Sequence, residues 1–370
     1  MGSPLADQVS SRLDRARRLA ATAGVDALVV TPGPDLQYLA GVVKHSHERL
    51  SALVLPTQDD AAFVVPRLER PGLDGSGVDQ AGIRVLDWVD GEDPHGLVAA
   101  CLDGAKRVAV AADMPALHVL GLRDALPLAT QELATPVLRE LRMRKDPAEV
   151  EYLRRAGAAI DAVHAQVPGW LRPGRTEAEV GADITAGIVA AGHSEAAFVI
   201  VGSGPNGASP HHEVSDRVIE TGDVVVVDIG GPLPEGYNSD CTRTYVVGGP
   251  TDEVTDVYAV LQRAQAAAVA AARPGVTAES VDEAARAIIR DAGFGEYFVH
   301  RTGHGIGLEV HEEPYIVAGN ELALEPGMAF SIEPGIYFPD RWGARIEDIV
   351  VVTEDGCEAV NTRPHDLLPC

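Results

Sequence analysis

The sequence predicts a two-domain protein in which a smaller mixed α/β domain precedes a larger α+β domain. The chain has 370 residues, which is enough for two domains with sizeable hydrophobic cores. Its first third alternates short apolar segments with helical ones, whereas long alanine-rich helical segments begin at Pro147. We therefore expect the boundary near Lys145, with domains over residues 1–145 and 146–370.

The N-terminal domain is expected to begin with a helix over residues 9–23, where apolar side chains recur at helical spacing. A second helix is expected over residues 93–103, and residues 135–145 end in a basic cluster at the boundary. Short apolar segments predict strands over residues 27–31, 51–55, 61–65, 83–86 and 107–111. This alternation of strands and helices is typical of a mixed α/β domain.

The C-terminal domain contains an internal repeat. Arg172-Pro-Gly-Arg-Thr176 and Arg273-Pro-Gly-Val-Thr277 each precede a helical segment, with the threonine at the N-cap position. Histidines at positions 211 and 311 follow at nearly the same distance. We therefore expect two similar half-domains related by a pseudo-twofold axis. Their helices are expected over residues 147–170, 176–191, 253–272 and 277–292.

Composition excludes several classes of protein. The chain carries 30 Lys and Arg against 55 Asp and Glu, so its formal net charge is −25 and its pI is near 4.7. This balance disfavours a nucleic-acid binder, which needs a basic surface. No apolar run reaches the length of a membrane span, and no secretory signal is visible, so we expect a soluble cytoplasmic protein. The four cysteines lack paired spacing, which argues against disulfides and thiolate metal sites.

Each half-domain carries two acidic residues in strand-like segments. Asp228 and Asp240 flank a turn, so a hairpin can place them side by side, and Glu333 and Glu347 have a similar spacing. Folding about a pseudo-twofold axis would gather these four carboxylates, which would repel one another unless cations neutralised them. His304, flanked by glycines, adds an imidazole.

This set of one imidazole and four carboxylates suits Mn²⁺, Fe²⁺, Co²⁺ or Zn²⁺. Five ligands exceed what one catalytic ion takes, since it must leave a position open, so two ions sharing bridging carboxylates fit better. The reaction class this predicts is metal-assisted hydrolysis.

Five motifs, in order, carry a resemblance to a known family. They are VDIGG at residues 227–231, NSDCTRT at 238–244, HRTGHGIGLEVHEEP at 300–314, SIEPGIY at 331–337 and RIED at 345–348. The C-terminal domain resembles the pita-bread metallopeptidases, which include methionine aminopeptidases, aminopeptidase P, Xaa-Pro dipeptidases (prolidases) and creatinase. The N-terminal domain resembles the one shared by prolidase, aminopeptidase P and creatinase. The whole chain looks closest to actinobacterial Xaa-Pro dipeptidases.

The resemblance implies roles for individual residues. Asp228, Asp240, His304, Glu333 and Glu347 match the ligands of a dinuclear site, in which Asp240 and Glu347 would bridge the ions. Glu333 would also receive the proton of the attacking water. His211 and His311 match two histidines that contact the scissile region and stabilise the tetrahedral intermediate or shuttle protons. We expect two divalent ions per subunit, Mn²⁺ before Co²⁺, Zn²⁺ or Fe²⁺.

Three further residues are candidates for substrate binding. His300 matches a residue that supports a ligand or lines the substrate pocket. Arg345, two positions before Glu347, could anchor a substrate carboxylate or neutralise the acidic cluster. Tyr38 lies in a segment similar to a family element whose aromatic side chain reaches a neighbouring subunit's pocket. The pair His45 and His47 is interpreted as part of a solvated loop and not as a metal site.

The activity that the resemblance implies is hydrolysis of the Xaa-Pro bond in dipeptides by a homodimer. Aminopeptidase P shares every motif and remains an alternative, as does a lyase or non-peptide hydrolase on the same fold. A peptide-binding module without catalysis is disfavoured because all five ligands are present. Methionine aminopeptidase is disfavoured because about 145 residues precede the catalytic domain. A dedicated site for Xaa-Pro bonds is reasonable, because proline lacks an N–H and has a fixed φ.

Overall fold

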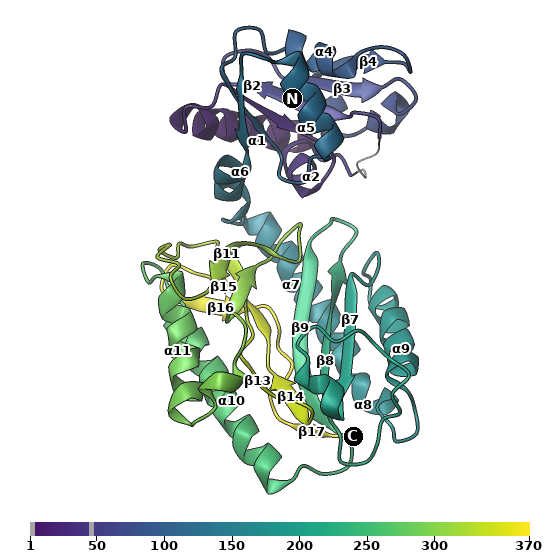
Figure 1. Ribbon diagram of the computed structural model, residues 1–370, viewed down its shortest axis with the longest axis vertical. Helices are drawn as coiled ribbons and strands as arrows, with labels where there is room; N and C mark the ends of the chain where they lie inside the picture. The colour runs from purple at the N-terminus through teal and green to yellow at the C-terminus, as the bar shows by residue number, and fades with distance from the viewer. Residues whose placement is uncertain (1–3, 44–47) are drawn as a thin grey trace. The chain divides into compact units, whose positions relative to one another are not determined.

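The computed structural model describes residues 4–43 and 48–370, so His45 and His47 lie outside the described residues. The chain divides into two compact units, Met1–Arg142 and Met143–Cys370 (Figure 1). We describe each unit by itself.

The first unit is built on a six-stranded mixed sheet with the order β4-β3-β2-β1-β5-β6. The β1–β2 and β2–β3 pairs are antiparallel, and the other three are parallel. Alternate residues of the central strands pack with α4 and α5 into one core, because side chains of a strand point alternately to its two faces. The elements are α1 (Pro4–Thr22), β1 (Ala27–Val30), α2 (Pro34–Ala40), β2 (Ala52–Pro56), β3 (Ala62–Pro66), η1 (Arg70–Leu73), α3 (Gly77–Gln80), β4 (Arg84–Trp88), α4 (Pro94–Ala100), β5 (Arg107–Val110), α5 (Ala116–Ala125), β6 (Thr130–Leu133) and α6 (Thr135–Arg142).

The sequence analysis missed several elements of this unit. Helix α2 is short; proline occupies its first turn, and Gly41 ends it in a left-handed conformation, so its boundaries resemble a loop in the sequence. Strand β6 lies at the edge of the sheet with the sequence TQEL and is largely accessible, so it has little apolar periodicity to detect.

The second unit repeats one helix–turn arrangement in its two halves. Thr176 caps α9 (Glu177–Ala190) with a capping box, as its spacing from Glu179 predicts. Thr277 caps α11 (Ala278–Asp291) without a side-chain hydrogen bond. Matching backbone hydrogen bonds, from Gly174 N to Ile219 O and from Gly275 N to Leu324 O, anchor the turns before the two helices. The expected internal repeat is therefore present in three dimensions.

Each half of the second unit has its own sheet. The first half has the order β17-β9-β8-β7, and the second has the order β11-β10-β12-β15-β16, with the separate hairpin β13-β14. The remaining elements are α7 (Pro147–His164), α8 (Val167–Trp170), β7 (Phe198–Ser203), η2 (Gly204–Ala208), β8 (Val224–Pro232), β9 (Asn238–Val246), α10 (Asp252–Ala271), η3 (Gly295–Tyr297), β10 (Gly303–Gly305), β11 (Glu312–Ile316), β12 (Ala329–Ile332), β13 (Gly335–Phe338), β14 (Trp342–Arg345), β15 (Asp348–Val352), β16 (Cys357–Ala359) and β17 (Leu368–Pro369).

Helices cover the outer sides of both sheets (Figure 1). One core joins α7, α8 and α9 to β7, β8 and β9, and a second joins α10 and α11 to β12, β14 and β15. The expected single helix over residues 147–170 is instead divided into α7 and α8. Pro168 lacks an N–H and favours a new first turn over continuation of α7. None of the helices in residues 4–43 and 48–370 is long and apolar enough to cross a membrane.

Candidate metal centre

Asp228 and Asp240 lie on neighbouring antiparallel strands. The register places Asp240 opposite Gly230 and Asp228 opposite Thr242, so the two carboxylates are diagonal neighbours on one face of the β8–β9 ladder. Both residues are buried. The expected hairpin therefore brings both aspartates to one site, offset by two residues along the strands.

Glu333 and Glu347 lie where strands are interrupted. Glu333 follows β12 and precedes Pro334, and Glu347 lies between β14 and β15. Backbone hydrogen bonds from Glu333 N to Thr302 O and from Glu347 N to Thr242 O hold both positions. Because proline cannot continue a central ladder, the chain turns after Glu333. Glu347 directly precedes β15.

His304 lies on the short strand β10. Its backbone packs closely against β12 and β11, since a Cβ on Gly303 would lie 1.8 Å from Ser331 O and one on Gly305 would lie 2.2 Å from Glu313 O. The glycines beside His304 are therefore required by close backbone approach, as their pattern predicts. His304 Nδ1 lies 3.1 Å from Gly305 O, and its Nε2 lies 3.2 Å from Glu333 Oε1 and 3.6 Å from Asp240 Oδ2.

The carboxylates carry unfavourable electrostatics. Burial, followed by the charges of neighbouring carboxylates, raises the pKa of Asp240 and of Glu347 well above the ordinary range. Burial also opposes ionisation of Glu333, but its hydrogen bond to His304 and the nearby positive charges lower its pKa to about 2. Such a cluster is costly as it stands and would be stabilised by cations.

The donor set fits divalent metal ions. Single ligand atoms of Asp240, His304 and Glu347 all lie within 4.8 Å of one another. Asp228 Oδ1 is buried and has no hydrogen-bond partner among the described residues. A buried carboxylate oxygen without a donor is unfavourable in a protein unless a cation or water occupies its lone pairs. All five residues expected as ligands line one cavity.

Arg345 is buried and its guanidinium is fully engaged. Nη2 donates to Asp228 Oδ2 over 2.6 Å, Nη1 donates to Tyr337 Oη over 2.6 Å, and Nε donates to Thr242 Oγ1 over 3.1 Å. Of the two roles considered from the sequence, these contacts favour neutralisation of the acidic cluster over capture of a substrate carboxylate.

A cavity of about 780 Å³ opens onto this cluster, and His211, His300 and His311 lie in its lining. Burial lowers the pKa of His300, whose Nε2 lies 2.9 Å from Tyr337 Oη. Partial removal from water, then the neighbouring His304 and Arg301, lower the pKa of His311 to about 4, so its imidazole is neutral near pH 7. Apolar side chains also line the cavity: Ala197, Phe198, Ile200, Pro210 and Val310.

Two family models match the chain. Residues 151–354 match metallopeptidase family M24, and residues 12–144 match the creatinase/prolidase N-terminal domain. The chain belongs to metallopeptidase family M24. The resemblance in its motifs and the expected pita-bread fold are thereby confirmed, and the protein is an enzyme of the metallopeptidase class.

Relatives of known name match this M24 enzyme over nearly its whole length. The probable dipeptidase PepE of Mycobacterium tuberculosis is 62% identical over 364 residues, which cover 98% of this chain and 97% of that protein. The Xaa-Pro dipeptidase of Lactobacillus helveticus is 36% identical, with 96% and 98% covered. The crystal structure of dipeptidase PepE from Mycobacterium ulcerans superposes with a TM-score of 0.95 at 60% identity, covering 100% of this chain and 99% of that one.

Tyr38, expected to reach a neighbouring subunit's pocket, is instead buried within the first unit of the M24 enzyme, with 2% of the residue exposed. Its hydroxyl donates to Leu141 O over 3.2 Å, and the Arg12 guanidinium lies 4.1 Å from its ring centroid. A side chain so enclosed packs its own unit. The motif behind this expectation matches the family element imperfectly, because Asp35 stands at its first position. Asp35 forms an ion pair with Arg142 of the same unit.

Three polar side chains that hold the site were not identified as site residues from the sequence. Thr242 donates to Glu347 Oε2 over 2.6 Å, Ser331 donates to Glu333 Oε1 over 3.0 Å, and Tyr337 links His300 to Arg345. The sequence spacing of two of them, Thr242 and Ser331, could have identified them. Thr242 is two residues after Asp240, and Ser331 two before Glu333, which is the spacing of side chains on one face of a strand.

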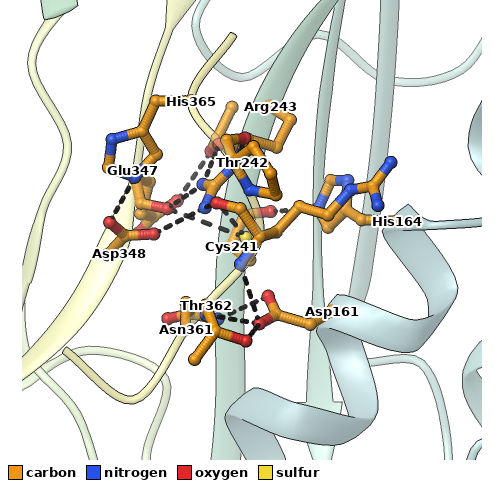
Figure 2. A network of polar contacts seen from close by, with 12 residues as sticks. Asp161, His164, Cys241, Thr242, Arg243, Glu347, Asp348, Asn361, Thr362 and His365 are labelled. Carbon is orange, nitrogen blue, oxygen red and sulfur yellow. Dashed lines mark hydrogen bonds and ion pairs between the residues drawn. The ribbon is translucent and has the colours of Figure 1, made fainter.

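A second network of buried polar groups lies behind Glu347 (Figure 2). Arg243 donates to Glu347 O, to Asp348 Oδ1 over 2.7 Å, and to the carbonyl oxygens of residues 363 and 364. His365 Nε2 lies 2.6 Å from Asp348 Oδ2. Asp161, on α7, accepts from the backbone N–H groups of residues 362 and 363. The C-terminal segment is thereby tied to α7, to β9, which carries Asp240, and to β15, which begins directly after Glu347.

Proposed function

We propose that this enzyme hydrolyses the Xaa-Pro peptide bond of dipeptides with the aid of two divalent metal ions. The observation that carries the proposal is the cluster around His304, where mutually repelling carboxylates line one cavity and Asp228 Oδ1 has no hydrogen-bond partner within residues 4–43 and 48–370. The residues that would hold the ions are Asp228, Asp240, His304, Glu333 and Glu347. Mn²⁺ is the proposed metal, although the same donors would accept Co²⁺, Zn²⁺ or Fe²⁺.

When bound, a metal pair supplies Lewis acidity and lowers the pKa of a water to near neutrality. The residues of the chain supply the rest. Glu333 Oε1 accepts the proton of the attacking water, because this carboxylate is ionised and faces the cavity. Ser331 donates a hydrogen bond to this carboxylate and orients it. Arg345 holds Asp228 through one oxygen and leaves the other available to a metal.

The histidines act on the substrate in this proposal. His211 and His311 come from corresponding positions of the two half-domains, and both line the cavity. An imidazole N–H directed at the carbonyl oxygen would stabilise the negative charge that develops there. A neutral imidazole that accepts the proton first taken up by Glu333 could then pass a proton to the departing proline nitrogen. His300, held by Tyr337, lines the pocket for the substrate.

The choice of substrate rests on the relatives. The Lactobacillus helveticus relative is named Xaa-Pro dipeptidase, and the mycobacterial relatives are named dipeptidases. The apolar side chains in the lining of the cavity are compatible with a proline ring. Following the resemblance of the N-terminal domain, we propose that the enzyme works as a homodimer.

Product release from Ala-Pro and Ala-Pro-Ala by metal-stripped enzyme, with and without Mn²⁺, tests the proposal. We expect cleavage of Ala-Pro only when Mn²⁺ is present, and little cleavage of the tripeptide. Preferential cleavage of Ala-Pro-Ala would replace the proposal with aminopeptidase P activity. No cleavage of either peptide after confirmed metal loading would overturn it in favour of a lyase or non-peptide hydrolase, or of a peptide-binding module without catalysis.

A further inference from the structure

Two arginines line the cavity, and they differ in their partners. Arg345 is buried and saturated by Asp228, Tyr337 and Thr242. Arg301 is half-buried, and its guanidinium carbon lies 4.5 Å from the ring centroid of Tyr315. Within the part of the chain that the structure describes, no carboxylate forms an ion pair with Arg301 and no side-chain hydrogen bond engages it. Arg301 is therefore the cavity cation whose charge remains available.

The place of Arg301 is set by the strand that carries His304. Tyr315 lies on β11, directly opposite His304 in the β10–β11 ladder, and directly opposed residues share a face of the sheet. The guanidinium that rests on Tyr315 is thus held beside the metal cluster. Arg301 and His311 line the same cavity. Stacking on an aromatic ring orients a guanidinium without using its N–H donors.

The chemistry of a dipeptide substrate supplies a partner for this cation. In an Xaa-Pro dipeptide, the free carboxylate is joined to the scissile nitrogen through a single Cα, so it must enter the same cavity as the reacting bond. In a longer peptide a neutral amide carbonyl occupies that place. A guanidinium binds a carboxylate through two parallel hydrogen bonds, and such a charge-assisted pair is much stronger than a bond to a neutral carbonyl.

We propose that Arg301 binds the C-terminal carboxylate of the dipeptide and is the residue that makes the enzyme prefer dipeptides to longer peptides. This inference rests on the proposed Xaa-Pro activity and deepens it. Arg345, the other arginine in the lining, cannot take this role without abandoning Asp228. Arg301 is a specificity-determining residue and takes no part in proton transfer.

Substrates that differ only in the terminal charge test the proposal. Ala-Pro and its amide, Ala-Pro-NH₂, have the same scissile bond, but only the first has a carboxylate. We expect Arg301→Gln to lower kcat/KM for Ala-Pro by about 10- to 100-fold, mostly through KM, because the lost contact is charge-assisted and is made in both ground and transition states. Activity on the amide should change less than about twofold, and Arg301→Lys should recover part of the loss.

Matched variants separate this role from a structural one. Arg341→Gln removes an exposed arginine that pairs with Glu253, and it should leave the preference for Ala-Pro unchanged. Equal losses on Ala-Pro and its amide in Arg301→Gln would overturn the proposal, because a structural role would not distinguish them. Full activity of Arg301→Gln on Ala-Pro would overturn it as well.

A binding measurement keeps the test independent of turnover. Calorimetric titration of Mn²⁺-loaded enzyme with L-proline and with L-prolinamide probes the same contact using the product and its uncharged analogue. We expect the wild type to favour proline, and Arg301→Gln to lose that preference by a similar factor. A preference for proline that survives in the variant contradicts the role of Arg301. If the wild-type enzyme binds proline more tightly than prolinamide but cleaves no Xaa-Pro peptide, the proposed function is contradicted and the carboxylate-binding role of Arg301 is not.

Discussion

Arg345 donates a hydrogen bond from Nη2 to Asp228 Oδ2 over 2.6 Å, and the second oxygen of that carboxylate, Oδ1, has no hydrogen-bond partner among the described residues. The two side chains are 2% and 12% exposed, so this is a buried ion pair at the edge of the acidic cluster. The guanidinium orients the carboxylate and leaves one oxygen facing the cavity. The orientation of the Asp228 carboxylate therefore depends on Arg345, which we do not propose as a metal ligand.

Removal of Arg345 should expose the dependence of Asp228 on this pair. We expect Arg345→Met to lower the free energy of unfolding of the metal-free protein by about 3–5 kcal/mol, because an uncompensated charge stays buried. Adding Asp228→Asn should recover part of that loss. Urea denaturation of both single variants and the double variant measures the coupling. Arg341→Met, in an exposed pair, should cost less than about 1 kcal/mol, and an equal cost at both arginines would contradict the buried pair.

Asp240→Asn should have opposite effects on the metal-free and metal-loaded protein. The variant removes one of several buried, mutually repelling carboxylates, so we expect the metal-free protein to melt at a higher temperature than wild type. Mn²⁺ should raise the Tm of wild type by mass action and raise that of the variant little or not at all. Calorimetry and metal analysis measure both effects, and hydrolysis should be abolished. Normal metal loading in this variant would remove Asp240 from the site.

His304→Ala tests the same centre through its only expected nitrogen ligand. We expect loss of metal loading and of hydrolysis, with little change in the far-ultraviolet circular dichroism spectrum, since β10 is held by its backbone contacts to β11 and β12. His212→Ala is the matched control, because His212 pairs with Glu177 through an Nε2–Oε2 distance of 2.7 Å and we assign it no metal or substrate. Wild-type activity in His304→Ala would contradict the proposed centre.

Tyr337→Phe should weaken catalysis without removing any ligand. The phenol oxygen accepts a hydrogen bond from Arg345 Nη1, and the hydroxyl lies 2.9 Å from His300 Nε2, so the variant leaves both buried groups without that partner. A lost buried hydrogen bond costs about 1–3 kcal/mol, so we expect kcat/KM to fall by about tenfold or more while metal content stays normal. Steady-state kinetics and metal analysis check this together. Full activity would show that His300 and Arg345 keep their positions without the hydroxyl.

His164 should make the protein sensitive to mild acid. Burial, then the charge of Arg243, lowers the pKa of His164 from its usual 6.5 to about 3, so the folded protein keeps it neutral between these values while the unfolded chain protonates it. Its stabilising contribution is complete above pH 6.5 and declines as pH falls from there toward 3. We expect a loss of about 2 kcal/mol at pH 5 relative to pH 7.5. His164→Gln should show a shallower decline in urea denaturation over this range; parallel curves would contradict the assignment.

The local sequence determined much of this protein. Strand and helix periods located most elements, and the repeated Arg-Pro-Gly turns predicted two related half-domains. The spacing of Asp228 and Asp240 predicted a hairpin, and Pro334 predicted a break after Glu333. The family motifs then indicated which five residues to place in one site, an assignment that stays a prediction of ligand roles. These features depend on neighbours within a few turns or strand positions, so the sequence records them directly.

Tertiary structure decided which side chains meet. The sequence left two roles open for Arg345, and a contact with Asp228 across 117 positions favours one of them. Tyr38 is enclosed in its own unit, and Arg301 is left with an aromatic ring as its partner, although neither outcome is visible in the local pattern. The physical reason is that burial and charge pairing depend on segments far apart in the chain, which come together only when the sheets close around the cavity.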